Sequence, residues 1–248
     1  MAARARHSAR GQHFLRSSAL AAELVRAAGI GRGDLVLDLG AGTGVLTQAL
    51  VRTGARVIAV ELDPVLAARL RSRFDDVVEE DILRIRLPRE PFRVVANLPF
   101  CDGTAILRRL LDPHVPLVSA DVIVAWDLAK KRTAVWPSTQ LGVEWGAWFE
   151  LTLVRRVPRE CFAPPPSVDA AVMRVARRRD ALIPANAVTH YRRFLERGFR
   201  GGPRAVLTST QLRRAATDLG FARNAQPRDL DAHQWAALYR IRAGLIHS

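Results

Sequence analysis

The sequence predicts an α/β protein, in which a seven-stranded, mostly parallel, doubly wound sheet is followed by a small C-terminal helical domain. Short apolar runs alternate with amphipathic helical stretches between residues 18 and 125, and this alternation is typical of a parallel sheet covered by helices. From about residue 180 onward the chain shows helical periodicity and no strand pattern. These observations indicate two domains, at residues 1–178 and 179–248.

Each element of the sheet domain follows from a local pattern. Seven apolar runs are the predicted strands, at residues 35–39, 56–60, 77–78, 92–96, 121–125, 149–154 and 168–175. Helices are expected at residues 18–28, 45–53 and 64–73; the first two stop before a glycine, and the third begins at an Asp63-Pro64 N-cap. No helical pattern separates the last two strands, so we expect them to form an antiparallel hairpin at one sheet edge.

The C-terminal domain is expected to contain three helices, at residues 187–198, 209–219 and 230–242. Two segments rich in glycine or proline separate them, Gly201-Gly202-Pro203 and Asn224–Pro227. The domain is strongly basic, because residues 174–248 contain 15 arginines and only 5 acidic residues.

The charge of the whole chain indicates a polyanionic partner. Lys and Arg number 38 against 24 Asp and Glu, which gives a net charge of +14, and only Lys130 and Lys131 are lysines. Skewed codon usage explains the preference for arginine, but it does not explain the positive excess. Arginine binds phosphate with a planar fork and stacks on bases, so nucleic acid is the leading candidate.

Composition disfavours several other classes of protein. The hydrophobic fraction is 49% and the charged fraction 25%, as in ordinary globular proteins, and no apolar run reaches the ~18 residues of a membrane span. Residues 1–10 are basic without an apolar centre, unlike a secretory signal peptide. Cys101 and Cys161 alone cannot form a disulfide framework or a four-cysteine zinc site. We therefore expect a cytoplasmic protein without membrane contact or a metal.

A glycine-rich turn, Asp38–Gly44 (DLGAGTG), directly follows the first predicted strand. Glycines such as Gly40 and Gly42 allow a ligand to lie against the main chain. Open α/β sheets bind ligands at this end of their strands. The spacing G-x-G-x-G differs from the G-x-G-x-x-G of a dinucleotide site.

Acidic residues follow the first three strands and indicate the kind of ligand. Glu61, 21 residues after Gly40, can accept both ribose hydroxyls of an adenosine, and Asp81 can bind the amine of adenine. Together with Asp38 they suit S-adenosylmethionine, whose sulfonium and amine are positive. The alternative interpretations are a turn-stabilising role for Asp38 and a helix N-cap for Asp63.

The segment Asn97-Leu98-Pro99-Phe100 directly follows the fourth strand. Proline keeps Leu98 extended, so the Asn97 side-chain oxygen and the Leu98 carbonyl become two acceptors for one amino group. Two acceptors on an adenine amine favour its pyramidal, nucleophilic form, and Phe100 offers a face on which a flipped base can stack. The alternative is an ordinary strand-to-turn connection with a core phenylalanine.

These motifs resemble those of the ribosomal RNA adenine N6-methyltransferases, which include the erythromycin-resistance (Erm) enzymes and the KsgA-type small-subunit dimethyltransferases. The resemblance covers nearly the whole chain and is carried by Gly11–Leu15 (GQHFL), DLGAGTG, AVELD, Asp81, NLPF and Phe162–Asp169 (FAPPPSVD). It implies a Rossmann-like methyltransferase fold with S-adenosylmethionine as cofactor. His13 stands where the family usually has asparagine.

The resemblance also implies roles for single residues. The cofactor contacts fall on His13, Leu15, Gly40, Gly42, Glu61, Leu62, Asp81, Ile82 and Asn97. The catalytic residues are Asn97, Leu98 and Phe100, and the rings that stack on the substrate base are Phe100 and Phe162. Methyl transfer is expected to be direct, without a covalent intermediate, metal or general base, so that catalysis comes from positioning.

Within this family the chain resembles the Erm type, on the segment Asp127–Pro158 and the basic helical appendage. The resemblance implies a monomeric enzyme that methylates one adenine of 23S rRNA and confers resistance to macrolide, lincosamide and streptogramin B antibiotics. Leu98 argues against the DNA adenine enzymes, which typically have N-P-P-Y. The alternatives are a KsgA-type 16S rRNA dimethyltransferase, a non-catalytic RNA-binding protein with a retained cofactor pocket, and an NAD-dependent oxidoreductase.

Cysteine and tryptophan residues receive structural interpretations. Cys101 follows Phe100, whereas a cytosine-methylating thiol usually follows proline, so we expect Cys101 to be a small packed residue. At least half of the sequence-clustered tryptophans are expected in the core; they are Trp126, Trp136, Trp145 and Trp148.

Overall fold

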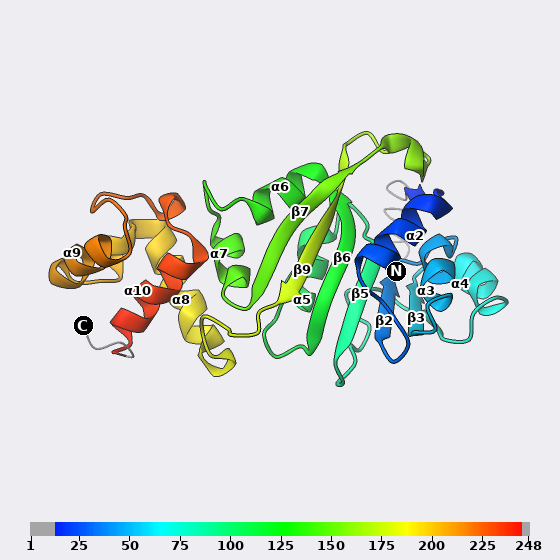
Figure 1. The fold of residues 1–248 in the computed structure, drawn as a ribbon, viewed down its shortest axis with the longest axis horizontal. Helices are drawn as coiled ribbons and strands as arrows, with labels where there is room; N and C mark the ends of the chain where they lie inside the picture. Colours follow the sequence, from blue (N-terminus) through cyan, green and yellow to red (C-terminus); the bar gives the residue numbers. More distant parts are fainter. Residues whose placement is uncertain (1–12, 245–248) are drawn as a thin grey trace. The chain divides into compact units, whose positions relative to one another are not determined.

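The structure is a computed structural model that describes residues 13–244. Gly11 and Gln12 of the N-terminal motif therefore lie outside the described residues. The fold contains a seven-stranded sheet with helices on both faces and a helical C-terminal region (Figure 1), which confirms the predicted fold class. Within residues 13–244, no helix combines the length and the apolar character needed to cross a bilayer.

The sheet has the strand order β4-β3-β2-β5-β6-β9-β7. Its strands are β2 (Leu35–Leu39), β3 (Arg56–Glu61), β4 (Val77–Glu79), β5 (Phe92–Asn97), β6 (Leu117–Ala125), β7 (Phe149–Val157) and β9 (Ala170–Arg177). The strands from β4 to β6 pair in parallel, whereas β9 is antiparallel to β6. The chain order reverses between β2 and β5, and ligands bind open α/β sheets at such a switch point.

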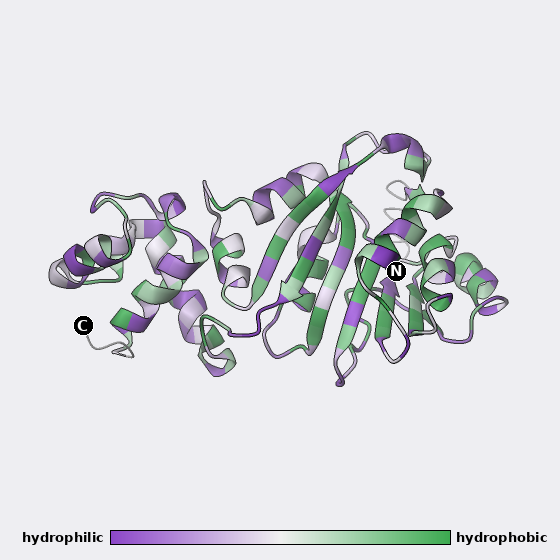
Figure 2. Ribbon diagram, viewed as in Figure 1, coloured by the Kyte–Doolittle hydropathy of each residue, from purple (hydrophilic) through white to green (hydrophobic). Residues whose placement is uncertain are grey.

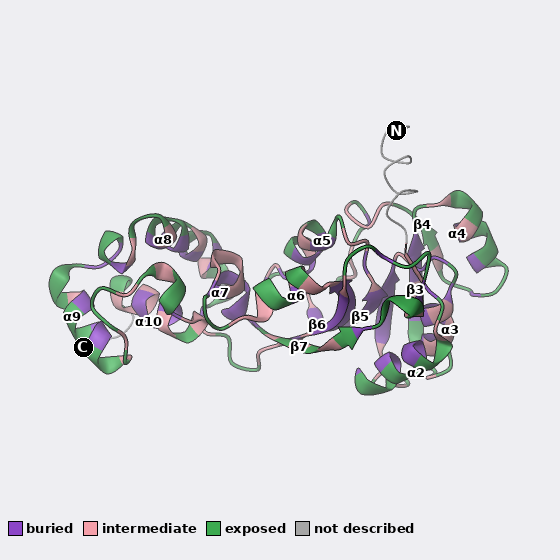
Figure 3. Cartoon of the chain, turned by 90° about the horizontal axis from the view of Figure 1, so that it is seen from above, coloured by how far each residue is buried: buried purple, intermediate pink, exposed green. Residues whose placement is uncertain are grey.

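Helices cover both faces of the sheet because its central strands, such as β2 and β5, are mostly apolar along their length (Figure 2). Helices α2 (Ser18–Ala27) and α3 (Val45–Val51) lie side by side on one face, and α5 (Gly103–Leu110) lies on the opposite face (Figures 1 and 3). Asp63 begins α4 (Pro64–Arg71) by accepting hydrogen bonds from two backbone N–H groups, which confirms it as an N-cap.

A second, two-stranded sheet was not predicted from the sequence. Strand β1 (Phe14–Leu15) pairs antiparallel with β8 (Phe162–Ala163), which follows a 3-10 turn at residues 159–161. Strands of two residues are too short to show a period of two. This pairing brings the N-terminal motif and the FAPPPS segment together.

The chain forms two compact units, and the second one includes a segment that the sequence analysis assigned to the first domain. Of the described residues, unit 1 comprises 13–129 and 152–176, and unit 2 comprises 130–151 and 177–244. The helices of unit 2 are α7 (Gln140–Gly146), α8 (Val188–Gly201), α9 (Ser209–Asp218) and α10 (Ala232–Arg242), and α6 (Trp126–Thr133) leads into it.

Aromatic packing explains why residues 130–151 belong to unit 2. Trp148 is fully buried, donates from Nε1 to the carbonyl of Ile183 at 2.7 Å, and meets Tyr191 edge to face at 5.8 Å. Trp145 is equally buried, whereas Trp136 is 60% exposed. Two of the four clustered tryptophans are therefore core residues, as expected.

Candidate active site

The glycine-rich turn lies at the carboxyl end of β2 in a conformation that requires glycine. The φ angles are +78° at Gly40, +55° at Gly42 and +81° at Gly44. A Cβ on Gly42 would also lie 2.7 Å from Cδ1 of Phe14. The Gly40 N–H donates to the Val60 carbonyl at 2.8 Å, which ties the turn to β3. The turn therefore requires glycine both for its backbone conformation and, at Gly42, for its contact with Phe14.

Glu61 is the last residue of β3, and its carboxylate is fixed in orientation. One oxygen accepts from the Gly42 N–H at 2.7 Å and the other from the Asp63 N–H at 2.9 Å. Each carboxylate oxygen has a second lone pair, so Glu61 can still accept hydroxyl donors. Leu62 beside it is 44% exposed and offers an apolar surface.

Asp81 and Ile82 follow β4 and reach the same end of the sheet. Oδ1 of Asp81 accepts from the Leu83 N–H at 2.9 Å. A Cβ on Gly40 would lie 3.5 Å from Cδ1 of Ile82, so Ile82 flanks the glycine turn. Arg109 of α5 donates to the Ile82 carbonyl and holds this loop. Sequence reasoning missed Arg109, because a lone arginine on an amphipathic helix gives no local signal.

Asn97, the last residue of β5, presents a buried acceptor without a partner. Its Nδ2 donates to the His13 carbonyl at 2.8 Å, which sets the orientation of the amide. Oδ1 is buried and has no hydrogen-bond partner. An unpaired buried acceptor costs about 1–3 kcal/mol, so Oδ1 is placed for a donor on a bound ligand.

Leu98 and Phe100 continue from Asn97. The Leu98 N–H donates to the Ile123 carbonyl at 3.0 Å, and its side chain is buried. Phe100 is half-buried; its ring lies 5.7 Å from that of His13 and 6.1 Å from that of Phe162, which it meets edge to face. Phe100 thus has two fixed neighbours and still reaches the surface.

The β1–β8 pairing sets the positions of the remaining predicted residues. His13 Nδ1 donates to the Pro164 carbonyl at 2.9 Å, and Leu15 is buried opposite Phe162. Phe162 has 0% exposure. The role of Phe162 in stacking on the substrate base therefore needs correction, because a ring without exposed surface offers no face to a base. Instead, Phe162 supports Phe100.

Asp38 is buried beneath the glycine turn with an unusual pKa. Burial raises its pKa from 3.8 to about 7, and the nearby Glu61 adds to the shift, whereas the hydrogen bond from the Thr47 hydroxyl opposes it. That hydroxyl donates to Oδ2 at 2.6 Å. Asp38 is therefore not the turn-stabilising residue considered above, since its partner lies in α3. A cationic ligand at this turn would favour its charged form.

Neither cysteine nor metal chemistry is favoured here. Cys101 is exposed, so the expectation of a packed residue is wrong. Desolvation and the neighbouring Asp102 raise the pKa of the Cys101 thiol, which disfavours the thiolate nucleophile. Within the described part of the chain, no group of three or more His, Cys, Asp or Glu side chains is arranged to hold a metal ion.

The assembled groups fit S-adenosylmethionine. The ends of β3, β4 and β5 place acceptors at Glu61, Asp81 and Asn97 beside the glycine turn, and Asp38 lies buried beneath it. Ribose hydroxyls, an adenine amine and a positively charged sulfonium suit such acceptors, whereas the phosphates of a dinucleotide would be repelled. The buried, unpartnered Oδ1 of Asn97 is the observation that most directly indicates a missing donor.

Comparison with known proteins agrees with this geometry. The family described as ribosomal RNA adenine dimethylase matches residues 3–242. The mycinamicin-resistance protein MyrB of Micromonospora griseorubida is 36% identical over 93% of this chain and 77% of its own length. An rRNA adenine N-6-methyltransferase of Bacillus licheniformis is 29% identical over 92% of this chain and 84% of its own.

A solved structure has a similar fold. The crystal structure of the 23S rRNA methyltransferase ErmE superimposes with a TM-score of 0.81 at 29% sequence identity. The alignment covers 92% of this chain and 98% of that one. The similarity therefore extends through both units.

Proposed function

Because the chain belongs to the ribosomal RNA adenine dimethylase family, we propose that it transfers a methyl group from S-adenosylmethionine to N6 of an adenine in 23S rRNA. Its relatives are rRNA adenine N6-methyltransferases, and it is an S-adenosylmethionine-dependent enzyme of this class. The consequence is resistance to macrolide, lincosamide and streptogramin B antibiotics. The name of the mycinamicin-resistance relative and the likeness to a 23S rRNA enzyme support this assignment.

The single observation that carries the proposal is the unpaired Oδ1 of Asn97 at the end of β5. The His13 carbonyl holds the amide nitrogen, so Oδ1 is the atom left for the target amine. The Leu98 carbonyl is the second acceptor, so that Asn97 Oδ1 and this carbonyl each accept one hydrogen of the exocyclic amine. These two contacts would favour the pyramidal nitrogen, whose lone pair would bond to the methyl carbon while the carbon–sulfur bond breaks and its electron pair stays on the now neutral sulfur.

The cofactor supplies an electrophilic methyl group on a positively charged sulfur. In this proposal Glu61 would accept hydrogen bonds from the ribose hydroxyls and Asp81 one from the adenine amine, and Leu62 and Ile82 would contact the adenine ring. His13, Leu15, Gly40 and Gly42 line the rest of the site through backbone contacts, together with the Asn97 side chain. Phe100 stacks on the flipped substrate adenine, and its ring is kept in place by Phe162.

After transfer, the nitrogen bears a positive charge and releases one proton to solvent. In this proposal none of the named residues acts as a base or a nucleophile, so rate acceleration comes from holding two reactants in line. We also propose a monomer that works in the cytoplasm, where it meets rRNA.

Unit 2 is proposed to be the RNA-binding domain. It contains 17 Lys and Arg residues against 7 Asp and Glu residues, so it carries +10 of the total +14. Phosphate contacts supply most of the sequence-independent affinity for nucleic acids. The boundary proposed at residues 178 and 179 lies within three residues of the start of the C-terminal part of unit 2 at Arg177.

Methyl transfer to purified rRNA tests the function. The enzyme with labelled S-adenosylmethionine should label deproteinised 23S rRNA, primer extension should stop at one adenine, and mass spectrometry there counts the methyl groups. Label confined to 16S rRNA would replace the proposal by the small-subunit alternative. The absence of label on every rRNA would contradict the proposed methyltransferase activity. Tight binding of NADH, with no binding of S-adenosylhomocysteine, would support an oxidoreductase.

A further inference from the structure

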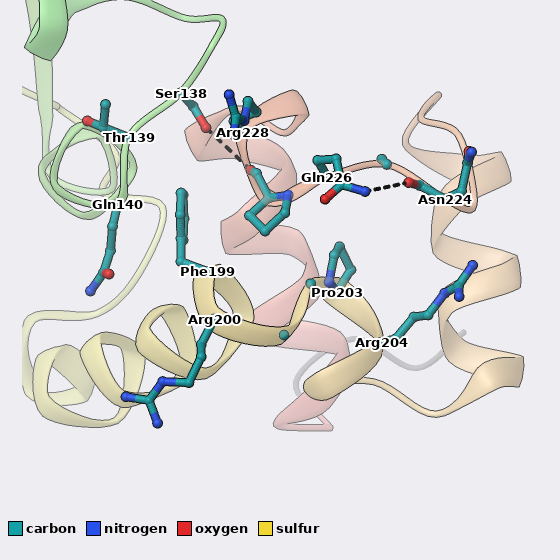
Figure 4. A pocket seen from close by; sticks show the side chains of 14 residues that line it. Ser138, Thr139, Gln140, Phe199, Arg200, Pro203, Arg204, Asn224, Gln226 and Arg228 are labelled. Atoms are coloured by element: carbon teal, nitrogen blue, oxygen red, sulfur yellow. Dashed lines mark hydrogen bonds between the residues drawn. The ribbon is translucent and has the colours of Figure 1, made fainter.

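Unit 2 contains a cavity that is formed by its own residues alone and has no part in the proposed methyl transfer (Figure 4). Its volume is about 670 Å³, in the range of small-ligand sites. Three segments surround it: the end of α8 with the following turn, residues 224–228, and residues 138–140 before and at the start of α7.

An aromatic ring is fixed at one side of the cavity. Phe199, near the end of α8, is half-buried and stacks on Trp235 with ring centroids 5.3 Å apart and an interplanar angle of 24°. The same ring lines the cavity (Figure 4). Because Trp235 is fully buried, Phe199 is a stacking surface that is already ordered.

Three arginines line the same space: Arg200 near the end of α8, and Arg204 and Arg228. Arg204 and Arg228 both line the cavity, and both are exposed. Within residues 13–244 neither guanidinium forms an ion pair or a hydrogen bond. No acidic residue lines the cavity, so these charges are available to an anion.

Polar groups complete the lining. Asn224 and Gln226 present amides, and the Gln226 amide contacts the Asn224 carbonyl at 3.5 Å (Figure 4). The segment that carries them is anchored, because the Pro227 carbonyl accepts from Trp235 Nε1 at 3.1 Å and from the Ser138 hydroxyl at 3.4 Å. Amide side chains on a fixed backbone can pair with the edge of a base.

We propose that this cavity binds one unpaired nucleotide of the rRNA, with its base against Phe199 and its phosphate between Arg204 and Arg228. An ordered aromatic face, free guanidinium groups and amides are the groups that bind single-stranded RNA. A base within a duplex has no free face for Phe199, so the nucleotide must be unpaired. The inference rests on the proposed RNA substrate and adds to it a second contact, which engages a nucleotide other than the methylated adenine.

Binding of a short, fluorescently labelled single-stranded RNA to the full-length protein tests the cavity without methyl transfer. Phe199→Leu should weaken binding about tenfold at every salt concentration, because it removes stacking and no charge. Arg204→Gln with Arg228→Gln should weaken binding and lower the slope of log K against log salt by about 0.7, the value for one phosphate contact on a single strand.

The matched control is Arg213→Gln with Arg214→Gln. These arginines are exposed on α9 in the same unit and do not line the cavity. The control pair should change affinity less than twofold. An equal loss of RNA affinity in both double variants would show that the arginines of the cavity act only through general surface charge, and it would overturn the proposal.

Photo-crosslinking locates the base directly. RNA that contains 5-iodouridine should cross-link to the peptide that carries Phe199 in the wild-type protein, and much less in the Arg204→Gln, Arg228→Gln variant. Wild-type affinity in a folded Phe199→Leu protein, or cross-links confined to other peptides, would overturn the proposal. Because neither readout needs catalysis, a failed methyl-transfer assay leaves this result interpretable.

Discussion

At the scale of single residues, Asn97 makes the sharpest prediction, because one side chain holds two different partners. Asn97→Ala should lower the methyl-transfer rate at saturating cofactor by roughly 10²–10³-fold, as expected for a group aimed at the reacting centre. Asn97→Asp keeps an acceptor but places a negative oxygen against the His13 carbonyl, which now accepts from Nδ2 at 2.8 Å. The aspartate variant should therefore fall between alanine and wild type in single-turnover assays, and a wild-type rate in alanine would contradict the role of Oδ1.

Phe100 and Phe162 are adjacent rings with different expected roles. Phe100→Ala should reduce methylation about tenfold to a hundredfold, which corresponds to the 1–3 kcal/mol of base stacking, whereas Phe100→Tyr should keep most activity. Phe162 is fully buried, so Phe162→Leu should lower the free energy of unfolding more than Phe100→Ala does. Urea unfolding and methylation measured side by side separate the two roles. Equal activity of the Phe100 alanine and tyrosine variants would exclude stacking.

Asp38 predicts a pH dependence of stability. Its pKa is raised by burial from 3.8 to about 7. Below pH ~4 the carboxyl is neutral in both the folded and the unfolded protein; as the pH rises to ~7 it ionises more readily in the unfolded protein, so the free energy of unfolding falls. The whole effect is roughly 4 kcal/mol at most, at about 1.4 kcal/mol per pKa unit. Asp38→Asn cannot ionise, so its unfolding free energy relative to wild type should rise between pH 4 and 8. A constant difference across this range would contradict the shifted pKa.

At the scale of elements, the glycine turn is predicted to be limited by contact as well as by backbone conformation. Gly42→Ala combines a positive φ with a Cβ 2.7 Å from Phe14, whereas Gly33→Ala has a φ of +94° and no atom within 4 Å of its Cβ. Gly33→Ala should therefore cost about 1–2 kcal/mol of backbone strain. Gly42→Ala should cost more and also weaken S-adenosylmethionine binding measured by calorimetry. Equal costs in the two variants would show that Phe14 yields freely.

The sequence predicts some elements better than others, because some depend on local sequence patterns and others on contacts between segments far apart in the sequence. Strand β2 is predicted to the residue, because its apolar run, interrupted only by Asp38, lies between two glycine-containing turns. Helices α8 and α10 are predicted within three residues at each end. The pairing of β1 with β8 joins segments about 150 residues apart, and no local pattern records it.

The residues of the candidate site also differ in how far the sequence predicts them. Gly40, Glu61 and Asn97 are predictable together, because residues that follow parallel strands meet at one sheet edge. The burial of Phe162 and the bond from Arg109 to Ile82 depend on tertiary packing. Cys101, expected to be packed, is exposed for the same reason.

At the scale of the whole molecule, charge and packing in unit 2 need different experiments. Deleting residues 181–248 would remove half of the net positive charge, +7 of +14, but also Ile183 and Tyr191, which cover Trp148. The truncated chain should therefore expose apolar surface, bind a hydrophobic dye and lose solubility. Any loss of RNA binding in it would not measure charge.

Replacing exposed arginines separates charge from packing. Glutamine at Arg200, Arg204, Arg223 and Arg228, all exposed in unit 2, removes four charges without touching its aromatic core. The unfolding midpoint should stay at the wild-type value, because exposed charges contribute little to stability. The salt slope for rRNA binding should fall by up to about 2–3, at 0.7–0.9 per phosphate contact, because Arg204 and Arg228 are proposed to hold one phosphate together. An unchanged slope in this folded variant would move the main RNA contact away from unit 2, and the arginines of the N-terminal segment, Arg4, Arg6, Arg10 and Arg16, would become the next to replace.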